Sequence, residues 1–203
     1  MSLVYRFAQI SIRFAGWLLG WKVIGRENVP EGAALIASNH LSNYDPPMLG
    51  AVLSMRVFYF AKIELFRNRA IGWFLRGVHA FPVRRGEADK QAWKHSQQVL
   101  KRGDQLIFFP EGTRSKDGEV QAGQPGMARL AFATGAPVVP TAICGSNRLK
   151  DVFFRRAKLR VGFAPPIYLS DYESPENDKA RYDRLTNDVM AAIRRLKAEI
   201  EAS

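Results

Sequence analysis

Short apolar segments alternate with longer amphipathic segments along most of the chain, and this alternation constrains the fold more than any other feature. Apolar runs of four to eight residues are typical of buried strands, and apolar residues at every third or fourth position are typical of helices. Strands that alternate with helices form parallel sheets, because each parallel connection needs a crossover. We therefore expect an α/β fold, with a largely parallel central sheet flanked by helices.

The predicted elements follow one another at short intervals. We expect strands at residues 22–25, 33–37, 56–61, 78–83, 105–109, 137–144 and 158–163. We expect helices at residues 47–54, 71–77, 87–101 and 127–134, and an amphipathic C-terminal helix around residues 185–200. Because ligands bind outside the carboxyl ends of the strands in such sheets, the residues that follow each strand are the candidates for a site.

Asn39 and His40 follow the second predicted strand, and Asp45 comes five residues after the histidine. A turn would lead from there into a helix, with Asp45 as its N-cap. That geometry can bring the carboxylate against one ring nitrogen and leave the other nitrogen to accept a proton. Taken alone, the spacing favours a structural interpretation, in which His40 ends a strand and Asp45 caps a helix, because such pairs arise often by chance.

Other polar residues follow strands at the same end of the sheet. They are Lys62, Arg84 and the loop residues Glu111, Gly112, Thr113 and Arg114. The guanidinium of Arg114 offers a planar fork of donors for a phosphate, and Gly112 allows the backbone to approach a ligand closely. Glu111 could hold that fork or receive a hydroxyl proton. The alternative is a surface loop with a local Glu111–Arg114 pair, which would be worth about 0–1 kcal/mol.

The composition limits the possible partners and cofactors. The 203 residues have a net charge of +11, which favours an acidic partner: nucleic acid, anionic lipid or an acidic protein. The sequence contains no phosphate-binding P-loop and no dinucleotide-binding glycine motif. The three histidines, at 40, 79 and 95, are too dispersed to predict a metal site. We expect His79 to pack in the core and His95 to be solvated, and we do not favour Cys144 as a nucleophile.

The first 21 residues form an amphipathic helix by their spacing. Its apolar positions are Leu3, Phe7, Ile10, Phe14, Trp17 or Leu18, and Trp21. Arg6, Arg13 and Lys22 interrupt the run, so it is unsuited to span a bilayer. We expect residues 1–21 to lie in the membrane interface and residues 22–203 to form the α/β domain; the alternative is a helix packed on the domain's own core.

A second basic and aromatic segment lies near residue 150. It contains Arg148, Lys150, Arg155, Arg156, Lys158 and Arg160, together with Phe153 and Phe154. The segment fits a solvated strand face and a contact with anionic lipid or an acidic carrier protein equally well.

Two motifs in this order resemble the glycerolipid acyltransferase superfamily, and the lysophosphatidic acid acyltransferase branch most closely. They are Asn39-His40-x4-Asp45 and Phe109-Pro110-Glu111-Gly112-Thr113-Arg114. The segments 81–84 and 138–143 are similar to two further blocks of that family, so the likeness extends from about Val23 to about Pro166.

The resemblance implies a reaction and a set of roles. His40 would be the general base and Asp45 would orient it, while a fatty acyl group passes from acyl-CoA or acyl carrier protein to the hydroxyl of lysophosphatidic acid. The product would be phosphatidic acid, formed in phospholipid synthesis without an acyl-enzyme, a metal or a cofactor. The implied substrate-binding residues are Lys62, Arg84, Glu111, Gly112, Thr113 and Arg114. The implied location is the cytoplasmic face of the cell membrane, with membrane lipid and not nucleic acid as the partner.

One departure from the family pattern concerns the acceptor. Family members often have lysines just before the glycine that starts the next helix, whereas here Gln124 and Pro125 precede Gly126. Two alternatives therefore stay open: an acceptor that is another lysophospholipid or a phosphate-free alcohol, and a non-catalytic protein that binds anionic surfaces.

Overall fold

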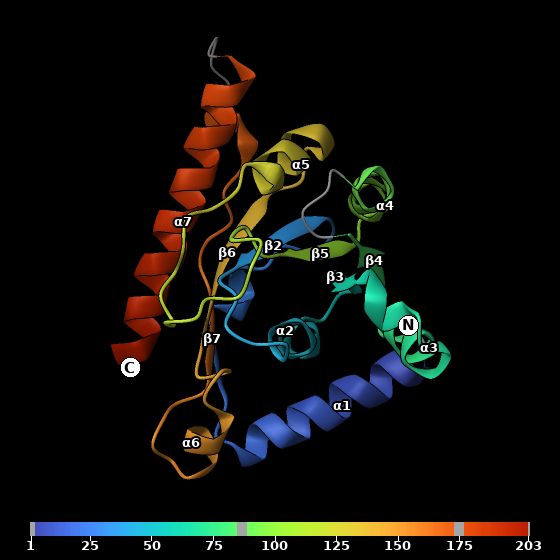
Figure 1. Ribbon diagram of the computed structural model, residues 1–203. Helices are drawn as coiled ribbons and strands as arrows, with labels where there is room; N and C mark the ends of the chain where they lie inside the picture. The colour runs from blue at the N-terminus through green and yellow to red at the C-terminus, as the bar shows by residue number, and fades with distance from the viewer. Residues whose placement is uncertain (1–2, 85–88, 173–176, 203) are drawn as a thin grey trace.

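A seven-stranded sheet forms the centre of the computed structural model, which describes residues 3–84, 89–172 and 177–202 (Figure 1). The strands are β1 Lys22–Ile24, β2 Ala34–Ser38, β3 Val57–Lys62, β4 Ala80–Val83, β5 Gln105–Phe108, β6 Val138–Cys144 and β7 Arg160–Phe163. Their order in the sheet is β1-β7-β6-β2-β5-β3-β4. All neighbouring pairs are parallel except β6 and β7. The prediction of a largely parallel α/β fold is confirmed.

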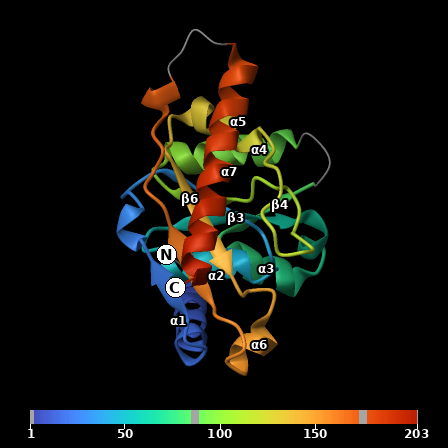
Figure 2. The ribbon, with the colours of Figure 1, turned by 90° about the vertical axis from the view of Figure 1, so that its left-hand side faces the viewer.

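Helices cover both faces of this sheet (Figures 1 and 2). They are α1 Leu3–Leu18, α2 Asp45–Val52, α3 Arg69–Gly77, α4 Lys90–Lys101, α5 Gly126–Thr134, α6 Leu149–Phe153 and α7 Asp178–Ala202, with short 3-10 turns at Arg26–Asn28, Ile63–Phe66 and Leu169–Tyr172. Helices α4, α5 and α7 pack on one face, and α1 and α2 pack on the other. Within the described residues, no helix is both long and apolar enough to cross a membrane.

Strand β2 lies in the middle of the sheet and is buried on both faces. Leu35 and Ala37 pack in one core, whereas Ala34 and Ile36 pack in the other, as the alternation of side chains along a strand requires. A continuous apolar run is the expected sequence of such a strand. Because β2 ends at Ser38, the next residues emerge at the carboxyl edge of the sheet.

Helix α1 packs on the protein through the side opposite its largest apolar residues. The side chains of Tyr5, Gln9 and Arg13 donate hydrogen bonds to backbone carbonyls at the end of α2, with Arg13 Nε 2.5 Å from the Ala51 oxygen. The last carbonyls of a helix have no partner within it, and a cation there also complements the helix dipole. Its large apolar side chains face outward and are 60–84% exposed: Leu3, Phe7, Ile10, Phe14, Trp17 and Leu18. On the inner side, Tyr5 is buried in the core, and Val4 and Ala8 pack against it. The alternative of a helix packed on the domain's own core is therefore correct for this side, whereas the large apolar side chains from Leu3 to Leu18 face away from it.

The structure corrects three local predictions. Helix α2 begins at Asp45 itself, and Tyr44 is its N-cap residue, so Asp45 does not cap the helix. The helix expected at 87–101 begins at Lys90 after an Asp89 N-cap, and residues 87 and 88 lie outside the described part of the chain. His95 is only partly solvated: its ring packs against Phe81 with centroids 4.4 Å apart, and burial lowers its pKa.

Candidate active site

The loop after β2 holds His40 in a fixed place. The Asn39 amide accepts a hydrogen bond from the Ile143 backbone N–H at 2.8 Å and donates one to the Ile143 carbonyl at 3.0 Å. The Ser115 backbone N–H donates to the His40 carbonyl at 2.7 Å. Neighbouring strand β6 and the 109–115 loop thus hold both sides of the histidine.

The carboxylate of Asp45 contacts the imidazole of His40, as the spacing of the two residues predicted. Its Oδ2 atom lies 2.8 Å from His40 Nδ1, and it also accepts the backbone N–H groups of Leu41 and Ser42 at 2.7 Å each. Because an ionised carboxylate only accepts, the proton of this bond sits on Nδ1. Nε2 is then left with a lone pair that can accept a proton.

Two residues of the 109–115 loop complete the surroundings of His40. The Phe109 ring stacks on the imidazole with centroids 4.0 Å apart. Glu111 accepts the His40 backbone N–H at 3.0 Å and the Gln121 backbone N–H at 3.3 Å. The Glu111 side chain is buried, and this burial raises the pKa of its carboxyl group. Glu111 therefore ties together two backbone segments behind the site, which the sequence did not predict.

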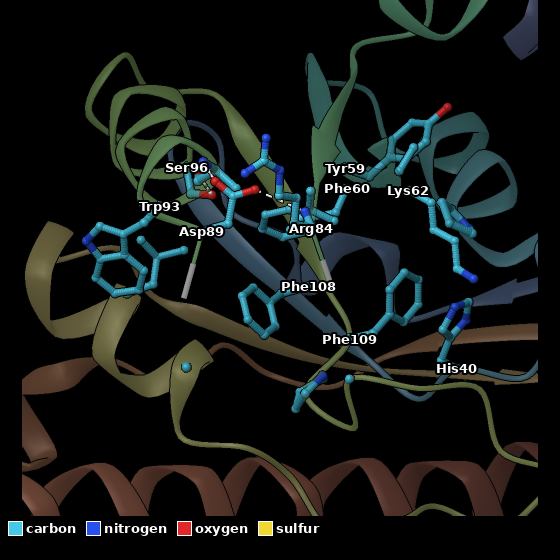
Figure 3. Close-up of a pocket in the computed structure, with 18 of the residues that line it drawn as sticks. His40, Tyr59, Phe60, Lys62, Arg84, Asp89, Trp93, Ser96, Phe108 and Phe109 are labelled. Carbon is cyan, nitrogen blue, oxygen red and sulfur yellow. Dashed lines mark hydrogen bonds between the residues drawn. The ribbon is translucent and has the colours of Figure 1, made fainter. Parts of the chain in front are cut away.

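A cavity of about 930 Å³ opens beside His40. It lies between strands β3 and β5 and helices α3, α4 and α5, and Figure 3 shows the aromatic rings that line it. Its apolar lining includes Tyr59, Phe60, Leu65, Phe74, Leu75, Val83, Trp93, Phe108, Phe109 and Leu130. Its charged lining consists of Lys62, Arg84, Asp89, Lys90, Arg114 and Arg129. Ligand sites are commonly of this size and this mixed character.

The predicted substrate-binding residues occupy different parts of this site. Lys62, the last residue of β3, points toward His40 (Figure 3). Gly112 and Arg114 also line the cavity. Glu111 and Thr113 are not among its lining residues. Arg84 also lines the cavity, but it lies beside Asp89, which accepts its backbone N–H at 3.0 Å, and not beside Lys62 and His40 (Figure 3). The expected gathering of Lys62, Arg84 and Arg114 around His40 is therefore incomplete.

Sequence reasoning missed Arg129, which lines the cavity from helix α5. It lies one turn after Gly126, near the place where a cation of the family pattern was expected and not found. The signal that could have identified it is its spacing: residues three apart on a helix share one face, so Arg129 lies on the face of Gly126. The aromatic lining was missed because cavity and core side chains have the same sequence pattern.

A buried imidazole–carboxylate pair beside an apolar cavity is typical of enzymes in which a general base acts on a substrate with an apolar part. A family model described as acyltransferase matches residues 20–144. This match includes His40, Asp45 and the 109–115 loop. The chain belongs to the acyltransferase family.

Individual relatives agree with this assignment. The chain is 32% identical over 185 residues to 1-acyl-sn-glycerol-3-phosphate acyltransferase of Bacillus subtilis strain 168, covering 90% of each chain. It is 32% identical over 174 residues to the protein of the same name from Streptococcus pneumoniae, covering 85% of this chain and 63% of that one. The crystal structure of 1-acyl-sn-glycerophosphate (LPA) acyltransferase PlsC from Thermotoga maritima superimposes with a TM-score of 0.78 at 25% identity, over 98% of this chain and 80% of that one.

Proposed function

We propose that this protein transfers a fatty acyl group from a thioester to the free hydroxyl of lysophosphatidic acid, which gives phosphatidic acid. The observation that supports this most directly is the 2.8 Å contact between His40 Nδ1 and Asp45 Oδ2, because His40 also lines the cavity. The relatives named above are similar over most of the chain, which supports the same acceptor.

The chemistry follows from the protonation of the imidazole. His40 Nε2 removes the proton of the acceptor hydroxyl while the oxygen attacks the thioester carbonyl carbon. Asp45 stabilises the imidazolium that forms. When the tetrahedral intermediate collapses, the carbon–sulfur bond breaks, the imidazolium returns the proton to the leaving thiolate, and the new ester and a free thiol result. The proton balance closes without an acyl-enzyme.

The charged and apolar parts of the cavity have different roles in this proposal. Lys62 and Arg114 bind the acceptor phosphate, which has a charge of about −1.5 to −2 near neutral pH. Arg129 adds a third cation from helix α5. The rings of Tyr59, Phe60 and Phe108 line the space for an acyl chain. Arg84 lines the same cavity beside Asp89 and apart from Lys62 and His40, so we do not assign it to the phosphate (Figure 3).

The outward apolar face of α1 supports a location at the membrane surface. Polar side chains hold α1 on the protein, so its apolar face is left for the headgroup–acyl boundary of a bilayer. Residues 1–21 are then the membrane-associating helix and residues 22–203 the catalytic domain. We place the protein at the cytoplasmic face of the cell membrane, where acyl-CoA or acyl carrier protein would reach it.

The test is an acceptor panel with two donors. Purified protein receives lysophosphatidic acid, lysophosphatidylcholine or a long-chain alcohol, each with palmitoyl-CoA and with palmitoyl acyl carrier protein. We expect phosphatidic acid as the main product and its loss in His40→Ala. The control is His95→Ala, because the His95 ring packs on Phe81 and is not among the cavity-lining residues.

Three outcomes would contradict the proposal. Equal turnover in wild type and His40→Ala would show that the imidazole is not the base. Turnover restricted to acceptors without phosphate would move the substrate class away from lysophosphatidic acid. Binding of anionic vesicles with no turnover on any acceptor would favour the non-catalytic alternative.

A further inference from the structure

The segment that joins β6 to β7 presents two aromatic side chains to solvent. We call residues 148–158, which contain helix α6, the α6 loop. Within it Phe153 is 70% exposed and Phe154 is 65% exposed, and their rings contact each other edge-on with centroids 5.3 Å apart. Adjacent exposed rings of this kind are unfavourable in water and are typical of a binding surface.

Cations surround these two rings. The exposed cations of the α6 loop are Arg148, Lys150, Arg155, Arg156 and Lys158. Asp151 is the only carboxylate of the loop, so five positive charges and one negative charge give a net charge of +4. Asp151 pairs with Arg148 at 2.9 Å, while the Arg156 guanidinium lies 5.7 Å from the Phe154 ring centroid.

The backbone holds the two phenylalanines at a tight reversal. Arg155 has a φ of 57°, in the left-handed region that non-glycine residues seldom adopt. The Arg156 backbone N–H closes the turn on the Asp151 carbonyl at 2.7 Å. On the inner side Val152 is buried against Met48 and Leu159, which anchors the loop to helix α2. The strained backbone at Arg155 and the buried Val152 thus hold Phe153 and Phe154 in a fixed, outward position.

The α6 loop is continuous with the exposed face of α1. Leu19 and Trp21, just after α1, belong to the same apolar cluster as Val152 and Leu159. Figures 1 and 2 agree that α6 lies beside the C-terminal end of α1, at the same end of the molecule. Because β6 runs parallel to β2, the loop also leaves the sheet at the edge where His40 emerges.

We propose that the α6 loop is a second membrane contact, which inserts Phe153 and Phe154 into a bilayer while its cations bind anionic headgroups. Aromatic side chains flanked by cations are the combination that an anionic membrane interface binds. An acidic protein surface would pair with the cations of the loop. It would also need apolar groups to cover the exposed rings of Phe153 and Phe154, which its acidic residues cannot provide. The inference deepens the membrane location proposed above and rests on it for the role of α1.

The experiment compares vesicle binding by variants of the 203-residue chain. Sedimentation with vesicles of phosphatidylcholine alone, and of phosphatidylcholine mixed with phosphatidylglycerol, gives partition constants over a range of salt. We expect F153S/F154S to weaken binding to both vesicles by about tenfold or more, because the variant no longer transfers two apolar rings from water into the bilayer. We expect R156Q/K158Q to weaken binding to the anionic vesicle alone, by roughly 30-fold at low salt.

Matched controls separate this surface from the general charge of the protein. K94Q/K101Q removes the same two charges from exposed positions of α4. Y168S removes an exposed ring away from the α6 loop. Its neighbour Ile167 pairs with Val138, the first residue of β6, whereas α6 follows the last residue of that strand. Both controls should bind vesicles as the wild type does.

Several results would overturn the proposal. One is that F153S/F154S and R156Q/K158Q bind vesicles as tightly as the wild type does. Another is that K94Q/K101Q loses as much vesicle binding as R156Q/K158Q. Unchanged vesicle binding with lost binding of acyl carrier protein in solution would assign the loop to a protein partner instead. Turnover on lysophosphatidic acid dispersed in detergent is measured in parallel. If F153S/F154S keeps this turnover but loses vesicle binding, the result supports the α6 loop as a membrane contact. If the wild type itself has no turnover, the proposed function fails and the membrane contact is still tested by the vesicle binding. Vesicle binding lost in F153S/F154S but retained in F7S/F14S would support the loop and reject the role of α1.

Discussion

Replacement of Asp45 by asparagine isolates the charge that faces His40. The oxygen of the amide would have to stay at the Oδ2 position, because three donors converge there: the Leu41 and Ser42 backbone N–H groups and His40 Nδ1–H. The NH₂ group would take the place of Oδ1, which has no hydrogen-bond partner among the described residues. The imidazole keeps its orientation, while a buried donor left without a partner lowers the stability by about 1–3 kcal/mol.

The expected loss in rate follows from the distance. Two unit charges 2.8 Å apart attract each other by about 6 kcal/mol at an effective dielectric constant of about 20. The imidazolium is only about half formed when the proton is in transfer, which leaves about 3 kcal/mol in the transition state. This energy corresponds to a decrease in kcat of about 10²-fold. Since Asp45 is buried behind His40 and does not line the cavity, both KM values should stay nearly constant.

The assay measures initial rates of wild type, D45N, H40A and the double variant, with lysophosphatidic acid and palmitoyl-CoA each varied. Thermal unfolding curves set a temperature at which all four proteins are folded. Because Asp45 acts through His40, the double variant should be no slower than H40A. A D45N rate within about threefold of wild type, or a loss confined to KM, would refute the assignment of Asp45 as the group that stabilises the imidazolium.

Four further predictions concern other parts of the molecule. Arg114→Ala should raise KM for lysophosphatidic acid by about tenfold or more with a smaller change in kcat, because a charge-assisted bond to the phosphate is lost. Burial raises the pKa of Glu111 in the folded protein. The stability that its neutral form contributes is therefore fully present below the unfolded pKa and is lost as the pH rises through the folded pKa. In urea unfolding, the stability advantage of wild type over E111Q should shrink as the pH rises. Burial raises the pKa of Cys144 to about 12, so its thiol should react with iodoacetamide only as the protein unfolds, and C144A should retain turnover. Gly145→Ala should lower Tm far more than Gly135→Ala, because both glycines have a positive φ, of 82° and 71°, but only the Cβ at 145 would collide with a backbone carbonyl oxygen.

The strands could be predicted from the sequence because their burial leaves a direct trace in it. All seven predicted strands are present, and their limits agree within two residues. The order of the strands and the antiparallel direction of β7 could not be predicted, because they depend on contacts between distant segments. Helix α6 was missed because five residues in a basic run give too short a pattern to recognise as a helix.

The candidate site could be predicted where chemistry follows directly from local sequence. Only four residues separate His40 from Asp45, and the local turn brings the two side chains together. Glu111 was expected to contact Arg114 or a substrate, yet it binds backbone N–H groups, because a carboxylate in a buried loop takes the nearest donors. The orientation of α1 was open for another reason: an apolar row has the same spacing whether it meets a protein core or a lipid surface.

Helix α2 has a consequence for how the protein meets its substrate. Its first residue orients the imidazole, its final carbonyls hold α1, and Met48 in between supports the α6 loop. Eight residues of helix measure about 12 Å, so one short rigid element connects His40 to α1 and to the α6 loop, the two membrane contacts that we propose. If both proposals hold, this one helix sets the height of His40 above the lipid headgroups. We expect an insertion in α2 after Met48 to shift the imidazole relative to α1, and so relative to the proposed membrane surface, while Pro46 and Pro47 of α2 keep their places in the cavity lining.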